Sequence, residues 1–240
     1  MEQKKKALGR GLEELFSTEV LDFDTFESNV METAKEEDIK EIPVSEIRPN
    51  PYQPRKVFND EALKDLCDSI KEHGVFQPII VKKSIKGYEI IAGERRVKAS
   101  ALAGKEEIPA IVRDFNDTQM MEIALLENLQ RENLSAIEEA IAYKSMLDKL
   151  GLTQEELSKK VGKSRSHITN TLGLLRLPAE VQAMVANNKL SMGHARVLSK
   201  LEDNDKILEM ARQIVERKIP VRELEQVAET EVKKVKVERK

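Results

Sequence analysis

The chain has 240 residues, of which 35% are charged and 4% aromatic, and its formal net charge is −3. This length accommodates one or two domains, and the single cysteine, Cys67, excludes an internal disulfide and a cysteine-cluster metal site. Three scattered histidines argue against a zinc site, and the absence of a long apolar run or a signal-peptide core predicts a cytoplasmic protein that does not enter a membrane.

The first 16 residues form a basic peptide with one apolar stripe. Its apolar residues have helical spacing: Leu8, Leu12, Leu15 and Phe16. Residues 17–38 are acidic and show no periodicity, which predicts a flexible linker. A tethered amphipathic peptide is typical of a partner-docking helix, and accidental amphipathicity is the alternative.

Residues 39–117 alternate between strand-like and helical patterns, which predicts a small α/β unit with a mixed sheet. Strands are expected at 42–47, 79–81, 88–92 and 108–112, with a hairpin turn at Lys86-Gly87. A helix is expected from Asp60 to Gly74, with Cys67 as a core thiol on its apolar face. Prolines 49, 51 and 54 mark an extended loop that carries Gln53 and Arg55.

The most informative segment of this unit is a strand that turns at Gly93 directly into a helix. Arg95 and Arg96 lie in the first turn of that helix, where cations oppose the helix dipole. An anion bound at the helix start explains them, because free backbone N–H groups and guanidinium groups both bind phosphate. The alternative is that both arginines are solvated or pair with Glu94.

From residue 118 to about 228 the pattern is helical, with long helices expected at 118–131 and 135–150. Glu127 and Asn128 offer adjacent hard oxygens that suit Mg²⁺ held together with phosphates, and Arg131 adds a partner for an anion. The alternative is a set of exposed helix residues near a helix break at Asn133.

A helix-turn-helix is predicted at 153–175. Thr153 and Glu156 form a capping box, Gly162 breaks the first helix, and the second helix is expected to turn Ile168, Leu172 and Leu175 inward. In such motifs the start of the second helix meets base edges in the major groove. The expected DNA-contacting residues are Lys163, Ser164, Arg165, Ser166, Asn170 and Thr171.

The local charge supports this prediction. Residues 153–200 contain 8 Lys and Arg against 3 acidic residues, an excess of +5 within an acidic chain. Such an excess favours a polyanionic partner for this segment. An ordinary helical hairpin remains the alternative. The last residues, 229–240, alternate charged residues with Val and are expected to be a linker or tail.

The motifs, in their order, resemble the ParB family of chromosome-partition proteins. The resemblance rests on segments 8–16, 50–55, 74–79, 93–96, 127–134 and 190–196. It implies a ParB- and sulfiredoxin-like N-terminal domain of α+β class followed by an all-α helix-turn-helix domain. The family usually ends in a small dimerisation domain, which is absent here, so we infer a truncated chain or one without that permanent dimer contact.

The resemblance further implies a slow, Mg²⁺-dependent CTP hydrolase that is stimulated by parS DNA and closes as a homodimeric sliding clamp. It places Glu127 in hydrolysis and in metal binding with Asn128, and Leu8, Arg10 and Leu12 against a ParA-type ATPase. The implied nucleotide-binding residues are Gln53, Arg55, Gln77, Gly93, Glu94, Arg95, Arg96, Asn128 and Arg131. The Smc condensin is a further implied partner, and association with the nucleoid is the implied location.

The related nucleoid-occlusion protein Noc reads a different DNA site. Arg165, Thr171 and Gly193 match the residues of parS readers, whereas Arg176 matches neither pattern. Two further alternatives are a plain helix-turn-helix repressor and a sulfiredoxin-like redox enzyme. The redox enzyme needs a reactive cysteine, and the expected burial of Cys67 argues against it.

Overall fold

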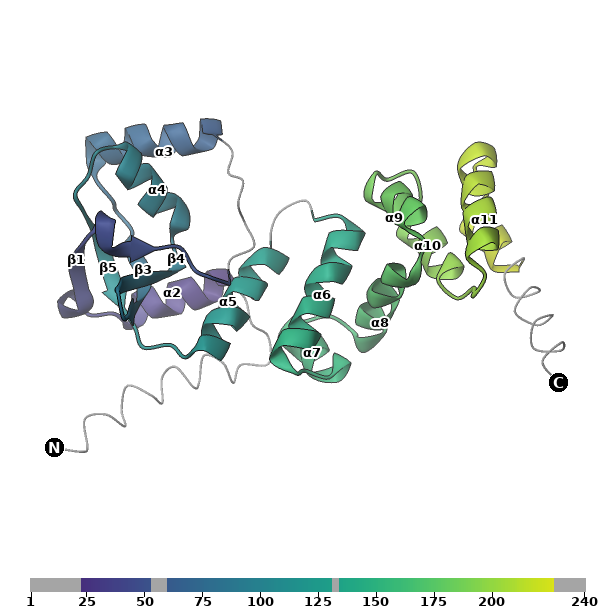
Figure 1. Ribbon diagram of the computed structural model, residues 1–240, viewed down its shortest axis with the longest axis horizontal. Helices are drawn as coiled ribbons and strands as arrows, with labels where there is room; N and C mark the ends of the chain where they lie inside the picture. The colour runs from purple at the N-terminus through teal and green to yellow at the C-terminus, as the bar shows by residue number, and fades with distance from the viewer. Residues whose placement is uncertain (1–22, 53–59, 131–133, 227–240) are drawn as a thin grey trace. The chain divides into compact units, whose positions relative to one another are not determined.

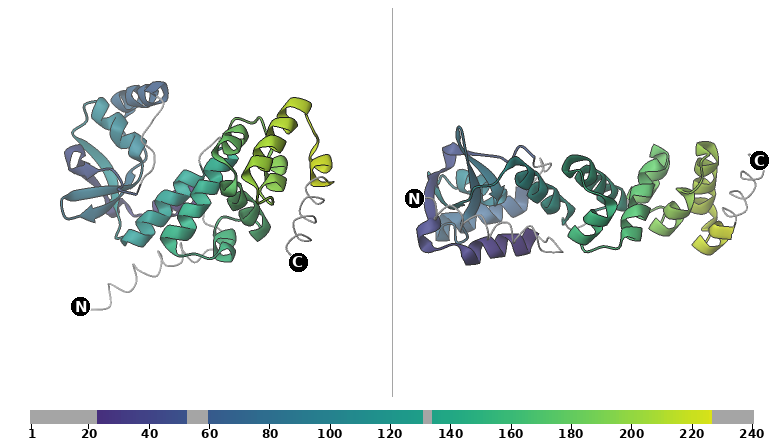
Figure 2. Two further views of the ribbon diagram at one scale, coloured as in Figure 1. Left: turned by 45° about the vertical axis from the view of Figure 1, so that its right-hand side comes forward. Right: turned by 90° about the horizontal axis from the view of Figure 1, so that it is seen from below.

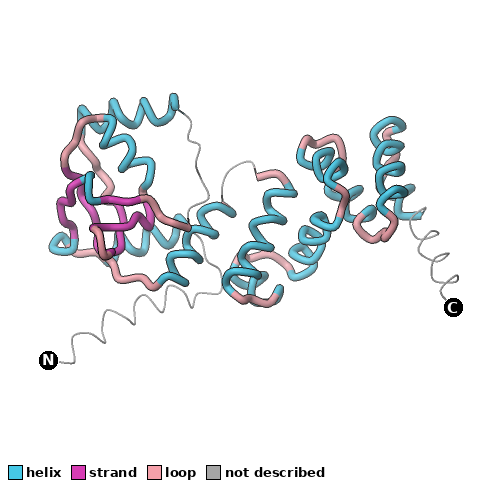
Figure 3. The backbone as a smooth tube through the Cα atoms, viewed as in Figure 1, coloured by secondary structure: helices cyan, strands magenta, loops and turns pink. Residues whose placement is uncertain are grey.

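The computed structural model describes residues 23–52, 60–130 and 134–226. The chain divides into two compact units, Met1–Gln130 and Arg131–Lys240. Within the described residues, strands occur in the first unit and the second unit is helical (Figure 3), which confirms the predicted α+β class. The peptide at 1–16 and the tail at 229–240 lie outside the described residues.

The first unit contains a mixed five-stranded sheet in the order β1-β5-β3-β4-β2. The β1–β5 and β3–β4 pairs are antiparallel, whereas β3–β5 and β2–β4 are parallel. The predicted hairpin is therefore confirmed. The strands are β1 (Ile39–Pro43), β2 (Ile47–Arg48), β3 (Ile79–Ser84), β4 (Gly87–Ala92) and β5 (Glu107–Val112), and short 3-10 turns at Glu36–Asp38 and Val44–Glu46 precede β1 and β2.

Helices cover both faces of this sheet because successive strand side chains point to opposite faces. On one face, Val81 and Ile90 pack with Val97 of α4 (Glu94–Leu102). Helix α3 (Asp60–His73) then packs on α4 through Cys67. Cys67 is 5% exposed, which confirms the expected core thiol.

The opposite face is covered by α2 (Phe23–Thr33) and α5 (Asp117–Leu129). Ile80 and Ile91 from the sheet pack there with Phe26 of α2 and Ile123 of α5. The three layers are visible in Figure 1 and again in the turned views of Figure 2.

Helix α2 corrects the described part of the flexible linker that we expected at 17–38, of which residues 17–22 lie outside the described residues. Phe23, Phe26 and Val30 recur at helical spacing, and the last two are buried against the sheet. The rings of Phe26 and Phe115 meet edge to face at 5.9 Å. Burial of this apolar stripe stabilises the helix despite its acidic composition.

The boundary between the units also differs from our expectation, which ended the first unit at residue 117. Met120 and Ile123 of α5 are buried in the core of the sheet, so α5 belongs to the first unit and the division falls after Gln130. Sequence periodicity identified the helix but could not show which core buries it.

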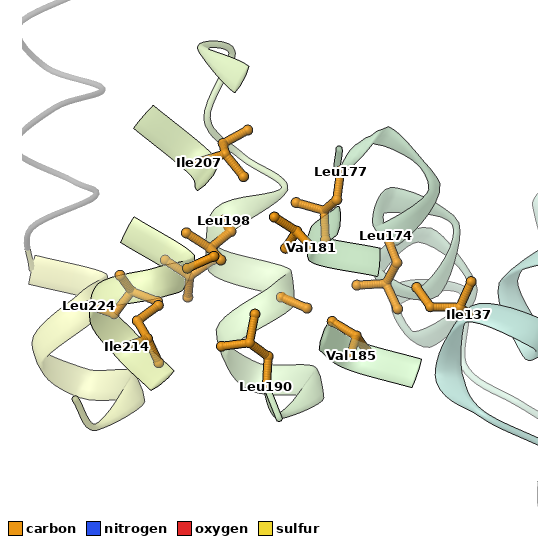
Figure 4. Packing of buried hydrophobic residues seen from close by; sticks show 13 residues of the cluster. Ile137, Leu174, Leu177, Val181, Val185, Leu190, Leu198, Ile207, Ile214 and Leu224 are labelled. Carbon is orange, nitrogen blue, oxygen red and sulfur yellow. The ribbon is translucent and has the colours of Figure 1, made fainter. Parts of the chain in front are cut away.

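A hydrophobic core of the second unit has buried residues that include Leu174, Val181, Leu198 and Ile214 (Figure 4). Its helices are α6 (Ala136–Leu150), α7 (Gln154–Lys160), α8 (Arg165–Gly173), the 3-10 turn η3 (Leu174–Arg176), α9 (Ala179–Ala186), α10 (Met192–Leu198) and α11 (Asn204–Arg217). Across the described residues of both units, none of the helices has the length and hydropathy needed to cross a bilayer.

The predicted helix-turn-helix is formed by α7 and α8. The capping box is present: Glu156 N–H donates to Thr153 Oγ1 at 3.2 Å, and Thr153 N–H donates to Glu156 Oε2 at 2.8 Å. Ile168 is buried as expected, but Leu174 is buried where Leu172 and Leu175 were expected, and these two stay partly exposed. Leu172 lies within α8, whereas Leu174 and Leu175 belong to the 3-10 turn η3, where the helical phase changes.

Candidate nucleotide and DNA sites

Gly93 forms the turn between β4 and α4. Its φ of 101° lies in the left-handed region, and a Cβ placed there would approach Ile79 Cγ2 to 2.7 Å. Only glycine therefore fits this turn without strain. Gly93 provides no side-chain cap to α4, so the N–H groups of the first helical turn are available to an anion.

The two arginines that follow have different partners. Arg95 is exposed, and its Nη2 donates to the Ala62 carbonyl oxygen at 3.4 Å. Arg96 is largely buried, and its Nη1 donates to the Pro78 carbonyl oxygen at 2.9 Å. Glu94 pairs with Lys98 at 3.0 Å. The alternative of a pair with Glu94 is therefore not what this helix start shows, whereas the alternative of a solvated arginine agrees with the exposure of Arg95.

Arg96 also holds a carboxylate. Its Nη2 donates to Oε1 of Glu27 at 2.5 Å, and the two side chains are 19% and 18% exposed. Glu27 belongs to α2, whereas Arg96 belongs to α4 on the opposite face of the sheet. The guanidinium of Arg96 thus forms an ion pair with a carboxylate of the chain itself.

Gln77 lies next to this contact. It immediately precedes Pro78, it is exposed, and it borders a cavity of about 470 Å³ together with residues of α2. The α2 residues that line the cavity are Asp24, Glu27, Ser28, Met31 and Glu32. The structure thus brings Gln77 and Arg96 to the same edge of the first unit.

Glu127 and Asn128 occupy the last turn of α5, and both are partly buried. Adjacent helix residues project about 100° apart around the axis, so one ion binds one of them directly more easily than both. One carboxylate and one amide match Mg²⁺, which keeps waters and phosphate oxygens among its ligands. No group of three metal-binding side chains occurs among the described residues, so an all-protein metal cage is not indicated there.

Helix α2 links α5 to Arg96. The Phe23 N–H donates to Oε1 of Gln130 at 2.7 Å, directly after the end of α5, and Glu27 lies one turn further along α2. The predicted nucleotide residues Gln53, Arg55 and Arg131 lie outside the described residues, as do the predicted ParA-contacting residues Leu8, Arg10 and Leu12.

In the second unit, Lys163, Ser164, Arg165 and Ser166 are all exposed at the start of α8. Ser164 is the N-cap, since its Oγ accepts the His167 N–H at 3.1 Å, and it also lies 3.0 Å from Ser166 Oγ. The sequence predicted these residues at the start of the second helix, and the structure places them there. Arg165 is the long cationic side chain of this turn.

Two predicted DNA-contacting residues have different surroundings from those expected. Thr171 is 0% exposed and its hydroxyl has no hydrogen-bond partner among the described residues, so the direct base contact that we predicted is wrong for this conformation. Position 171 lies on the core side of α8, next to the turn that buries Leu174. Gly193 packs against Val221, whose Cγ2 would lie 3.1 Å from an added Cβ, which gives this glycine a packing role.

A cavity of about 620 Å³ borders the C-terminal half of α8. Asn170 lies at its edge together with three cationic residues, Arg176, Arg196 and Lys200. Arg196 Nη2 also donates to Glu225 at 3.1 Å, whereas its Nε is buried without a partner. This groove extends the cationic surface beyond the residues that the sequence motif singled out, and the local charge excess was the signal for it.

Sequence reasoning missed the residues that hold α8 in place. His167 Nε2 lies 3.1 Å from Glu139 Oε1, and the same oxygen accepts the Tyr143 hydroxyl at 2.6 Å. Tyr143 is 1% exposed, and its ring meets that of His167 edge to face at 6.2 Å. Burial, followed by this hydrogen bond to Glu139, raises the pKa of Tyr143, so the hydroxyl stays a donor at neutral pH.

The sequence matches two domain families. Residues 28–129 match the ParB N-terminal domain and residues 132–233 match the ParB HTH domain. The chain belongs to the ParB family. It is 49% identical to stage 0 sporulation protein J of Bacillus subtilis over 222 residues, which cover 92% of this chain and 74% of that protein. A nucleoid occlusion protein of Halalkalibacterium halodurans is 46% identical over 196 residues, which cover 82% of this chain and 69% of that protein.

A solved structure of this family resembles the chain. The C-terminally truncated chromosome-partitioning protein ParB from Caulobacter crescentus, complexed to the centromeric parS site, is 40% identical, with a TM-score of 0.65 over 80% of this chain and 99% of that chain. The truncated Caulobacter protein complexed with CTP-gamma-S is 42% identical, and the match covers 74% of this chain and 98% of that chain, with a TM-score of 0.36.

Proposed function

We propose that this ParB-family chain is a chromosome-partition protein that binds parS DNA and uses CTP with Mg²⁺ to close and reopen a sliding, homodimeric clamp. Helix α8 reads the DNA, with Arg165 bridging a guanine and Lys163 contacting phosphate. Gly93, Arg95 and Arg96 hold the triphosphate, and Gln77 borders the nucleotide. Glu94, Gln53, Arg55 and Arg131 complete the nucleotide-binding set.

The observation that carries the nucleotide assignment is the guanidinium of Arg96. It binds a carboxylate oxygen, and it lies in the first turn of α4, directly after the Gly93 turn. A phosphate oxygen has the same charge and hydrogen-bonding capacity as that carboxylate oxygen. The 42% sequence identity to a ParB that was crystallised with CTP-gamma-S favours CTP as the nucleotide.

Metal binding and hydrolysis are assigned to the end of α5. Asn128 is proposed as the direct Mg²⁺ ligand, while Glu127 supports the metal and orients the hydrolytic water. Bound Mg²⁺ would neutralise charge on the triphosphate. We propose slow hydrolysis that parS stimulates, because the enzyme's role is to reset a DNA clamp.

The partners follow from the same assignment. The peptide with Leu8, Arg10 and Leu12 is proposed to contact a ParA-type ATPase, with Arg10 as its stimulating cation. The Smc condensin is a further proposed partner. Binding at parS would place the protein on the nucleoid.

The test is calorimetric titration of CTP and Mg²⁺ into the full chain, with and without a parS duplex, and with ATP and UTP as controls. CTP-selective binding and slow release of phosphate that increases with parS support the proposal. Failure to bind CTP both with and without parS would contradict the proposal, and a plain helix-turn-helix repressor would then be the remaining function.

Nucleoid occlusion is the second candidate function, because the identity to an occlusion protein, 46%, is close to the 49% found for the sporulation protein. Arg165, Thr171 and Gly193 favour parS, although Thr171 and Gly193 act through packing in this structure. Parallel titrations with parS and with the occlusion site separate the two functions, and we expect parS to bind more tightly.

A further inference from the structure

The anion on Arg96 is part of the protein itself. Glu27 Oε1 accepts from Arg96 Nη2 at 2.5 Å, and both side chains are about four-fifths buried. The second donor of the fork, Nη1, is used by the Pro78 carbonyl oxygen at 2.9 Å. An incoming phosphate therefore meets a guanidinium whose Nη1 and Nη2 each already donate one hydrogen bond within the chain.

Glu27 is held in this place by the packing of α2. Phe26 and Val30 on either side of it are 8% and 1% exposed in the core of the sheet. The Phe23 N–H donates to Gln130 and fixes the start of the helix. Glu27 is thus positioned by buried neighbours rather than by a mobile surface contact.

The surroundings of Glu27 also disfavour a polyanion. The cavity beside Gln77 is lined by three α2 carboxylates, those of Asp24, Glu27 and Glu32. A triphosphate near Arg96 would meet the partly buried charge of Glu27 at close range, whereas the exposed carboxylates of Asp24 and Glu32 repel it through solvent and therefore more weakly. Phosphate and Glu27 cannot both occupy the same donor.

We propose that Glu27 is an internal competitor of the nucleotide phosphate, which sets the affinity for CTP and couples nucleotide binding to the release of α2. This inference rests on the proposed function and extends it to a residue of α2. Because Phe23 of α2 also contacts Gln130 at the end of α5, release of α2 would reach the segment that carries Glu127 and Asn128.

The test compares Glu27→Gln with wild type and with Glu32→Gln, which removes an equal charge from the same helix and cavity. Calorimetry with Mg²⁺–CTP and separately with inorganic triphosphate gives both affinities. Glu27→Gln should bind each probe roughly 5- to 20-fold more tightly, because a charged competitor is lost. Glu32→Gln should stay within about twofold of wild type.

Equal affinity of wild type and Glu27→Gln for both probes would overturn the inference, and so would equal gains in both variants, which would indicate a general charge effect. Tighter triphosphate binding without CTP selectivity would support the competitor and contradict the proposed function. If neither probe bound the wild type or either variant, both the competitor role of Glu27 and the proposed function would be contradicted.

Hydrogen exchange over residues 23–33 tests the release of α2 in the wild-type protein, without any substitution. Saturating CTP should speed exchange of the α2 amides in the wild-type protein, because Glu27 is displaced and the helix loosens. Unchanged or slower exchange at saturating CTP would contradict the coupling.

Discussion

His167 on α8 lies 3.1 Å from Glu139 on α6, and that carboxylate also accepts the buried Tyr143 hydroxyl. The contact joins the first turn of α8, the helix that we propose reads the DNA, to α6. Since Arg165 is two residues from His167, this network holds the turn of the helix that carries Arg165.

The first prediction concerns Glu139. Glu139→Ala should destabilise the second unit by about 1–3 kcal/mol, because Tyr143 loses its partner while buried. It should also weaken parS binding several-fold, and CTP binding should not change. Glu139→Gln, which retains an acceptor, should restore most of the parS affinity in fluorescence anisotropy. Loss of DNA affinity in Glu139→Gln equal to that of Glu139→Ala would contradict a positioning role.

The second prediction concerns alkaline stability. Burial raises the pKa of Tyr143 above its ordinary value of 10.0, so the folded state holds a proton that the unfolded state releases. Stability from this group is present below about pH 10 and is lost as the pH rises further. In denaturant titrations from pH 8 to 11, wild type should lose more stability than Tyr143→Phe. If stability fell equally with pH in the two proteins, ionisation of Tyr143 would not be the cause of the alkaline loss of stability.

The third prediction uses two glycines with positive φ. Gly93→Ala should cost about 2–4 kcal/mol, because strained φ adds to the approach of Cβ to Ile79 at 2.7 Å. Gly104 has a φ of 75° with nothing within 4 Å of an added Cβ, so Gly104→Ala should cost about 1–2 kcal/mol, from φ strain alone. Thermal unfolding measures both, and equal costs would show that Ile79 does not restrict the Gly93 turn.

The fourth prediction follows from the burial of Thr171. Because its hydroxyl is buried without a partner, Thr171→Val should keep or raise stability and leave parS affinity within about twofold. Chemical unfolding and anisotropy are the two measurements. A large loss of parS affinity in a stable variant would show that Thr171 turns toward DNA on binding.

Local signals in the sequence predicted much of this fold. The capping box at Thr153 located the start of α7, and the turn at Gly93 located α4, because both depend on neighbouring residues alone. Helix α2 was missed because its acidic composition hid the spacing of Phe23, Phe26 and Val30, which was the signal that could have revealed it.

The parts of the site that escaped prediction depend on distant contacts. Glu27 lies 69 positions from Arg96, and Glu139 lies 28 positions from His167, so no local pattern connects them. Thr171 lies three residues after the buried Ile168 in α8, so its burial follows the helical spacing that the prediction of a base contact overlooked.

The most direct test of two separate sites uses two variants, Arg96→Ala and Arg165→Ala. For each variant, calorimetry with Mg²⁺–CTP measures nucleotide binding and anisotropy with parS measures DNA binding. Arg96→Ala should lose CTP binding and keep parS binding. Arg165→Ala should lose roughly 1–3 kcal/mol at parS and keep CTP binding. Equal loss of both activities in both folded variants would contradict the account.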